Sequence, residues 1–114
     1  MNTLADIPLH ENERQAIEAA THLLHEAFPI EQVILFGSKA RAAGDDESDI
    51  DLLVLTSRKL HWREEEAMTN TLFDVEMAHN VLISPLIVPA DEWFHGVYQV
   101  LAIHDEIERD GVAA

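Results

Sequence analysis

The feature that most constrains this chain is the segment 33–55, which reads VILFGSKARAAGDDESDIDLLVL. An apolar run at residues 33–36 ends on Gly37 and Ser38, and a second apolar run at residues 52–55 follows Asp49 and Asp51. Uniformly apolar runs rich in β-branched and aromatic residues are typical of strands buried on both faces. The segment therefore predicts strand, tight turn, loop and strand, with two carboxylates where the second strand begins.

The Gly37-Ser38 pair predicts a turn that can bind an anion. Glycine lets the backbone turn sharply and approach a ligand closely. Residues 38–43 are rich in helix formers, so the pair stands between a strand and the start of a short helix, where N–H groups and one hydroxyl can meet an anion. The alternative is an ordinary turn in which Ser38 is a helix N-cap.

Asp49 and Asp51 begin the second expected strand, residues 49–55. Side chains two apart in a strand share a face, and their Cα atoms lie roughly 6.6 Å apart. Both carboxylates can then reach one divalent cation or two neighbouring ones, and hard oxygen ligands suit Mg²⁺ or Mn²⁺. Without a cation, this pair beside a buried run is costly because like charges repel and burial penalises both. The alternative is that both are exposed at the strand end, with Asp49 closing a turn.

The two signals together predict a more specific chemistry. If the two strands are neighbours, the Gly-Ser turn and the carboxylates meet at the same end of the sheet. N–H groups there would bind a phosphate, and the carboxylates would bind a metal that bridges phosphates. That combination serves nucleotidyl transfer, in which catalysis is mostly positioning and charge neutralisation.

The stretch FGSKARAAGDDESDIDLLVL resembles the core motif of the polymerase-beta-type nucleotidyltransferase superfamily. It is similar above all to the small minimal nucleotidyltransferases (MNT), whose members include antitoxins paired with HEPN-domain toxins. The resemblance implies that Gly37 and Ser38 bind nucleotide phosphates, that Arg41 lies near them or anchors the loop, and that Asp49 and Asp51 bind Mg²⁺. It also implies transfer of a nucleoside monophosphate, AMP from ATP or another NTP, to a hydroxyl such as a tyrosine of a HEPN-type partner.

The sequence departs from the family pattern at two positions. Ala42 stands where the family usually has glycine after Ala-Arg. Active members commonly carry a third carboxylate on a later strand, but the expected strand at residues 81–88 has Ser84 at the aligned position. The alternative function is therefore a catalytically weak or inactive antitoxin that acts by binding its partner. An aminoglycoside-type transferase acting on a small molecule is a lesser alternative, because such an enzyme usually needs an added substrate domain and 114 residues leave little room for one.

Composition limits the partners. The 22 acidic residues outnumber seven Lys and Arg, which gives a formal net charge of −15. Such a chain does not attract a polyanion, so we expect no direct nucleic-acid binding, and the charge suits a basic protein partner or simply solubility. The lack of cysteine fits a reducing cytoplasm. No apolar run approaches the length of a membrane span, and no secretory signal is expected.

The remaining sequence predicts one nucleotidyltransferase domain over residues 1–114, of α/β (α+β) class, as a monomer or in a homo- or hetero-oligomer. A helix at 11–28 has an apolar stripe of Ile17, Ala20, Leu24 and Phe28. Further helices are expected at 62–80, with a stripe of Ala67, Leu72, Val75, Met77 and Ala78, at 90–95, and at 98–110, with Trp93, Val97 and Leu101 facing the core. The first two strands should be antiparallel neighbours, and a strand–helix–strand unit adds the third. The result is a small mixed β-sheet of about three to four strands, packed with helices.

Two other groups of residues have weaker functional interpretations. His22 and His25 are spaced i, i+3 on the first helix, where they could present imidazoles to a metal, but no third ligand is evident. Arg58, Lys59 and Arg63 form a basic segment that could face a nucleotide or a partner, or could be a solvated loop.

Overall fold

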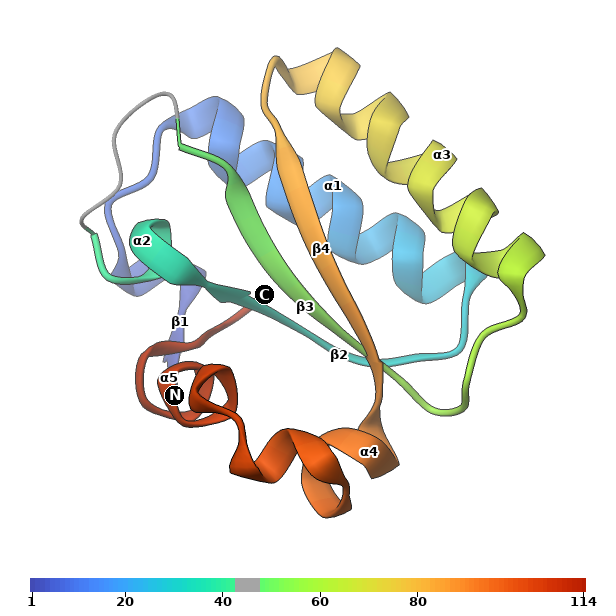
Figure 1. The fold of residues 1–114 in the computed structure, drawn as a ribbon. Coiled ribbons are helices and arrows are strands. Elements are labelled where there is room, and N and C mark those ends of the chain that lie inside the picture. Colours follow the sequence, from blue (N-terminus) through green and yellow to red (C-terminus); the bar gives the residue numbers. More distant parts are fainter. Residues whose placement is uncertain (43–47) are drawn as a thin grey trace.

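The computed structural model describes residues 1–42 and 48–114, which form a mixed sheet with helices packed on it (Figure 1). In chain order, the elements are β1 (Asn2–Thr3), a 3₁₀ turn (Leu4–Asp6), α1 (Glu11–Ala27), β2 (Ile30–Phe36), α2 (Gly37–Ala40), β3 (Ile50–Thr56), α3 (Trp62–His79), β4 (Ile83–Pro89), α4 (Ala90–His95), a second 3₁₀ turn (Val97–Val100), α5 (Ala102–Asp110) and β5 (Val112–Ala113). Most of the expected loop at residues 44–48 lies outside the described residues.

Within the described residues, the sheet has five strands in the order β1-β5-β2-β3-β4. The antiparallel β2–β3 pair and the parallel β3–β4 pair, joined through α3, are as the sequence predicts. The expected count of three to four strands is wrong because β1 and β5 are two-residue strands that pair with each other, and β5 also pairs with β2. Strands this short have no hydrophobic periodicity by which a sequence could show them. Pro85 lies on β4, which is an edge strand of the described sheet, the position in which proline is tolerated within sheets.

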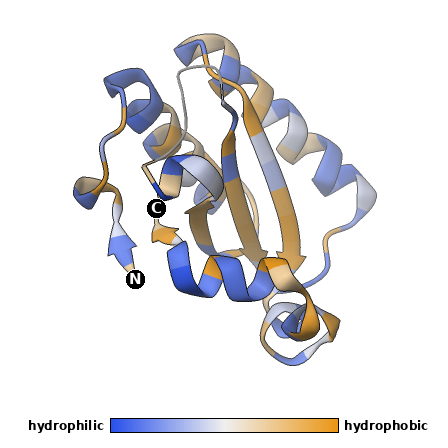
Figure 2. Cartoon of the chain, turned by 60° about the vertical axis from the view of Figure 1, so that its left-hand side comes forward, coloured by the Kyte–Doolittle hydropathy of each residue, from blue (hydrophilic) through white to orange (hydrophobic). Residues whose placement is uncertain are grey.

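The core has two layers, one on each face of the sheet. Ile50, Leu52 and Val54 of β3 pack with α1 and α3, whereas Leu53 and Leu55 pack with buried residues of α4 and α5. The alternation follows the two-residue period of a strand. Figure 2 shows hydrophobic residues concentrated along the central strands. Each fully buried Leu, Ile or Val contributes about 1.5–3 kcal/mol, so β3 is held from both sides.

The long helices α1 and α3 lie side by side on one face of the sheet (Figure 1). Ile17, Ala20 and Leu24 of α1 are buried, as their spacing predicts. The stripe expected on α3 is only partly right, because Met68, Leu72 and Val75 are buried whereas Ala67, Met77 and Ala78 are exposed. No helix in the described ranges has both the length and the apolar character needed to cross a lipid bilayer.

The C-terminal helical region differs from the expected single helix at residues 98–110. Gly96 ends α4, as predicted, but Leu101 adopts an extended backbone, so α5 starts only at Ala102. Val97 and Leu101 are exposed rather than in the core, while Trp93 is fully buried. The extended residues turn these side chains away from the stripe that a continuous helix would have formed.

Candidate active site

The candidate site lies where β2 ends and β3 and β4 begin. Asp51 is opposite Phe36 on antiparallel β2 and opposite Ser84 on parallel β4. The turn at Gly37 follows Phe36 directly, so it reaches the same end of the sheet as Asp51. Residues that are far apart in the sequence are therefore brought together by strand register.

Gly37 packs tightly against the Asp51 carboxylate. Its φ of +76° lies in the left-handed region that favours glycine. A Cβ built at this position would overlap Oδ2 of Asp51 and lie 3.2 Å from its Cγ. Gly37 is also the first residue of α2, and Phe36 is the N-cap. The interpretation of Ser38 as the N-cap is thus wrong, because Ser38 lies inside this four-residue helix.

Asp49 and Asp51 occupy different environments. Asp49 is exposed, and its Oδ2 accepts a hydrogen bond of 2.7 Å from the Ser84 hydroxyl. Asp51 is half-buried, and burial raises its pKa, with further increases from the charges of Asp49 and Glu106 and a decrease from Arg41. The ionised Asp51 is therefore destabilised, and a cation at this position would relieve that cost.

The donor chemistry of these two carboxylates fits a divalent cation such as Mg²⁺ or Mn²⁺. Hard cations prefer carboxylate oxygens, and Mg²⁺ is usually bound by one or two carboxylates together with water and substrate phosphates. Within residues 1–42 and 48–114, no group of three or more His, Cys, Asp or Glu side chains is arranged to hold a metal. The two carboxylates would therefore supply only part of the ligands of such an ion.

Ser84, which lies on β4, is beside the two carboxylates. It is the register partner of Asp51. Active members of the family that the sequence resembles commonly carry their third carboxylate at this position. Its hydroxyl donates to Asp49, so it orients one carboxylate and adds no negative charge. No Asp or Glu lies within the residues of β4.

Arg41 forms an ion pair that the sequence does not reveal. Its Nη1 lies 2.7 Å from Oε1 of Glu106 on α5, and both side chains are 40% exposed. Glu106 also lies close enough to Asp51 to raise its pKa. Because 65 positions separate Arg41 from Glu106, no local pattern could have identified Glu106 as part of the site.

A buried ion pair between Lys39 and Glu13 fixes α2 to α1. The two side chains are 5% and 7% exposed. Glu13 also accepts a hydrogen bond of 2.9 Å from the His10 backbone N–H. Because 26 positions separate Glu13 from Lys39, no local pattern in the sequence indicates this pair. Since α2 carries Gly37 and Ser38, this pair determines where the turn lies relative to the sheet.

The other sequence candidates lie outside this site. Arg58 forms an ion pair with Glu64, with 2.8 Å between Nη2 and Oε2. The Arg63 guanidinium lies over the Trp62 ring. These residues follow the C-terminal end of β3, at the opposite end from Asp49. His22 is exposed beside Glu26 on α1, so it forms part of a solvated helix face.

Similar solved structures share the fold. One, described as a candidate minimal nucleotidyltransferase, superposes with a TM-score of 0.61 at 21% identity, covering 90% of this chain and 92% of that one. Another, a mutant of the MntA–HpeT toxin–antitoxin pair, gives a TM-score of 0.56 at 18% identity, covering 94% of this chain and 72% of that one. A third, described as a candidate nucleotidyltransferase from Sulfolobus solfataricus, gives a TM-score of 0.53 at 17% identity, covering 93% of this chain and 87% of that one. At these identities the likeness concerns the fold.

A relative from Methanocaldococcus jannaschii, named as a candidate protein adenylyltransferase, is 36% identical over 58 residues. The aligned part covers 51% of this chain and 59% of that protein, so a large share of the relative has no counterpart in the alignment.

Residues 18–99 match the family described as Polymerase beta, Nucleotidyltransferase. The matched region is well over half of the chain and includes the Gly37-Ser38 turn, Arg41, both carboxylates of the site and Ser84. The match agrees with the mixed sheet and with the strand register that brings the turn to the carboxylates. The chain therefore belongs to the polymerase beta-type nucleotidyltransferase family.

Proposed function

We propose that the protein is a metal-dependent nucleotidyltransferase that transfers AMP from ATP to a hydroxyl of a protein acceptor. The observation that carries this proposal is the packing of the Gly37 backbone against the Asp51 carboxylate. This packing supports the proposal because the turn that would bind phosphate lies next to the carboxylate that would bind the cation, as transfer of a nucleotidyl group requires. The acceptor oxygen would bond to the α-phosphorus, the bond to pyrophosphate would break, and the hydroxyl proton would leave to solvent.

Each residue of the site has a role in this proposal. Gly37 and Ser38 bind the phosphates through backbone N–H groups and the hydroxyl, and Arg41 adds positive charge beside them. Asp49 and Asp51 hold Mg²⁺ or Mn²⁺, which neutralises phosphate charge when bound. The Ser84 hydroxyl keeps the Asp49 carboxylate in place through its hydrogen bond.

A protein acceptor is supported by three observations. The relative from M. jannaschii is named as a candidate protein adenylyltransferase, and a similar structure belongs to a toxin–antitoxin pair. The net charge of −15 favours a basic protein over a polyanion. We infer a hetero-oligomer in which this chain is the MNT antitoxin and a HEPN-type toxin is the partner and acceptor.

Ser84 favours a second candidate function, a nucleotidyltransferase-fold antitoxin with weak or no activity. With serine opposite Asp51, β4 provides no carboxylate to assist the acceptor hydroxyl. Such a protein would bind its partner and occlude it without transferring a nucleotide.

Labelled ATP, Mg²⁺ and the product of the adjacent gene would test the proposal. We expect label to be transferred to that protein by the wild type but not by the Asp49→Asn/Asp51→Asn double variant. Asp74→Asn is the matched control, because Asp74 is an exposed carboxylate on α3. Absence of transfer by the wild type, or equal transfer by the double variant, would contradict the proposed activity. If the double variant still rescues cells from the toxin, neutralisation occurs by binding alone.

A further inference from the structure

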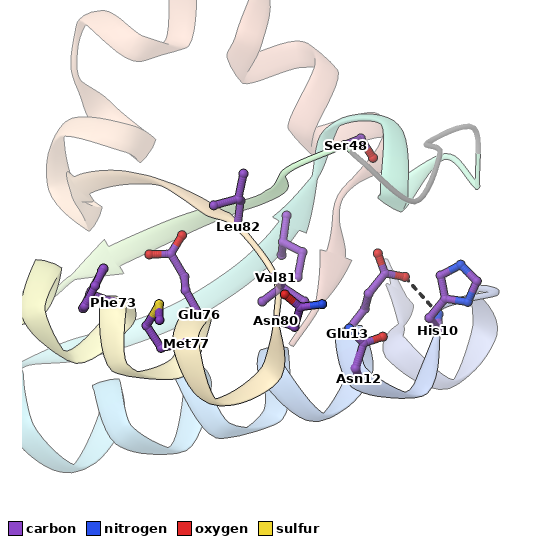
Figure 3. Close-up of a pocket in the computed structure, with 11 residues that line it drawn as sticks. His10, Asn12, Glu13, Ser48, Phe73, Glu76, Met77, Asn80, Val81 and Leu82 are labelled. Atoms are coloured by element: carbon purple, nitrogen blue, oxygen red, sulfur yellow. Dashed lines mark hydrogen bonds between the residues drawn. The ribbon is translucent and has the colours of Figure 1, made fainter.

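A hollow of about 710 Å³ lies on the α1–α3 side of the sheet, close to the candidate active site (Figure 3). It is bounded by the start of α1, the second half of α3 and the segments that enter β3 and β4. Three large apolar side chains line it and remain exposed: Phe73 at 57%, Met77 at 70% and Leu82 at 62%. Adjacent exposed apolar side chains of this size are typical of interaction sites.

The charge of the hollow disfavours a nucleotide. Its acidic lining residues are Glu76 and Glu13, and none of the lining residues in the described part of the chain is Lys or Arg. Glu13 is neutralised by its buried ion pair with Lys39, so Glu76 supplies the negative charge of the hollow. The Glu76 carboxylate accepts a hydrogen bond of 2.8 Å from the Ile83 N–H and is therefore fixed on the wall. A triphosphate would be repelled by Glu76, whereas a lysine or arginine would be attracted.

The hollow borders the end of the sheet that carries the proposed metal-binding carboxylates. Ser48, which lines it, precedes Asp49 directly. Leu82 lies beside this segment, because its carbonyl accepts a hydrogen bond of 2.9 Å from the Ile50 N–H, and Ser84, whose hydroxyl binds Asp49, follows two residues later. A polypeptide segment seated in the hollow would therefore lie next to the segment that carries Asp49, and an acceptor residue would reach the carboxylates around this end of the sheet.

We propose that this hollow docks the acceptor protein through a segment that combines Leu-like or aromatic side chains with Lys or Arg. The apolar side chains would pack on Phe73, Met77 and Leu82, and the basic ones would face Glu76. Its volume lies within the range typical of pockets that bury a small ligand, which is room for a few side chains rather than a whole protein surface. A second copy of this chain is disfavoured as the occupant, because two chains of −15 repel. The inference rests on the proposed function in taking the acceptor to be a protein.

The test uses two dye-labelled peptides of equal length, each with one tyrosine. In the lysine peptide the other residues alternate between leucine and lysine, and in the glutamate peptide they alternate between leucine and glutamate. Binding to the full chain is measured by fluorescence anisotropy without ATP or metal. We expect the lysine peptide to bind at least about tenfold more tightly than the glutamate peptide. Binding of the lysine peptide should be weakened by each of the single variants Phe73→Ser, Met77→Ser and Leu82→Ser. The triple variant should weaken this binding by about tenfold or more.

Val100→Ser is the matched control, because Val100 is an apolar residue that is 82% exposed outside the hollow. Equal affinity for the two peptides would overturn the docking proposal. Unchanged binding of the lysine peptide in the triple variant would also overturn it, because it would show attraction to the acidic surface in general. An equal loss of binding in Val100→Ser would overturn it as well, because the loss would then not depend on the hollow.

The docking proposal and the proposed function fail separately. A chain that binds the lysine peptide through the hollow but transfers no label lacks the proposed activity only. A triple variant that transfers label to the adjacent gene product as fast as the wild type would overturn docking in the hollow while leaving the activity intact.

Discussion

Replacement of Gly37 by alanine tests the packing between the turn and Asp51. The φ of +76° places the residue where an L-amino acid costs about 1–2 kcal/mol. The added Cβ would also overlap Oδ2 of Asp51, so the carboxylate must move. We expect the free energy of unfolding to fall by at least this amount. Since each kcal/mol corresponds to about 4 °C in a chain of this size, Tm should fall by about 4–8 °C.

Thermal unfolding followed by circular dichroism, with Mn²⁺ binding followed by calorimetry, would check this expectation. Ala42 provides the control, because it has a φ of 57° and is exposed. Ala42→Gly relieves backbone strain, so its stability should stay the same or rise by up to about 1 kcal/mol, with Mn²⁺ affinity unchanged. If Gly37→Ala unfolds at the wild-type temperature and binds Mn²⁺ as tightly, the reasoning on this packing is wrong.

Three further predictions concern charged side chains around the site. Lys39→Met leaves the buried Glu13 carboxylate without its cationic partner, so the free energy of unfolding measured in urea should fall by about 3–5 kcal/mol. The Lys39→Met/Glu13→Met double variant should recover most of this loss, and a loss under about 1 kcal/mol in the single variant would contradict the buried pair. Glu106→Gln breaks the partly exposed pair with Arg41, so stability should change by less than about 1 kcal/mol, while the pKa of Asp51, followed by carboxyl NMR, should fall. Because folding raises the pKa of Asp51, its ionisation destabilises the native state as pH rises through that pKa. Asp51→Asn should therefore raise the Tm of the metal-free protein at neutral pH, and the gain should vanish below about pH 3.9, where the unfolded chain is also protonated; a gain that persists there would refute the cause.

The central part of the fold follows from local patterns in the sequence. The apolar runs in β2 and β3 and the period of α1 predict their elements because each pattern lies within one element. The left-handed backbone at Asn80 ends α3 where the sequence places the stop. Ala42 also has a left-handed backbone, which gives a physical reason for the family's usual glycine there.

Other features could not be predicted because they depend on distant contacts. β1 and β5 exist only through pairing with each other and with β2. Glu106 reaches Arg41 across 65 positions, and Lys39 reaches Glu13 across 26. Met77 fits a helical stripe as well as Met68 does, but only the packing of α1 on α3 decides which of them is covered.

The interior position of β3 predicts the order in which the contacts of the site open in denaturant. β3 is hydrogen-bonded to a strand on each side, and Leu52, Leu53 and Val54 are 0% exposed. In native-state hydrogen exchange, amides of such a strand open only with the whole domain, whereas sheet edges and solvent-exposed contacts open first. Asp51 is carried by this protected strand, while the ion pair of its neighbour Glu106 with Arg41 is partly exposed, at 40% for both side chains. Mild denaturant should therefore loosen the Arg41–Glu106 contact early and leave Asp51 beside Gly37 until the cooperative transition.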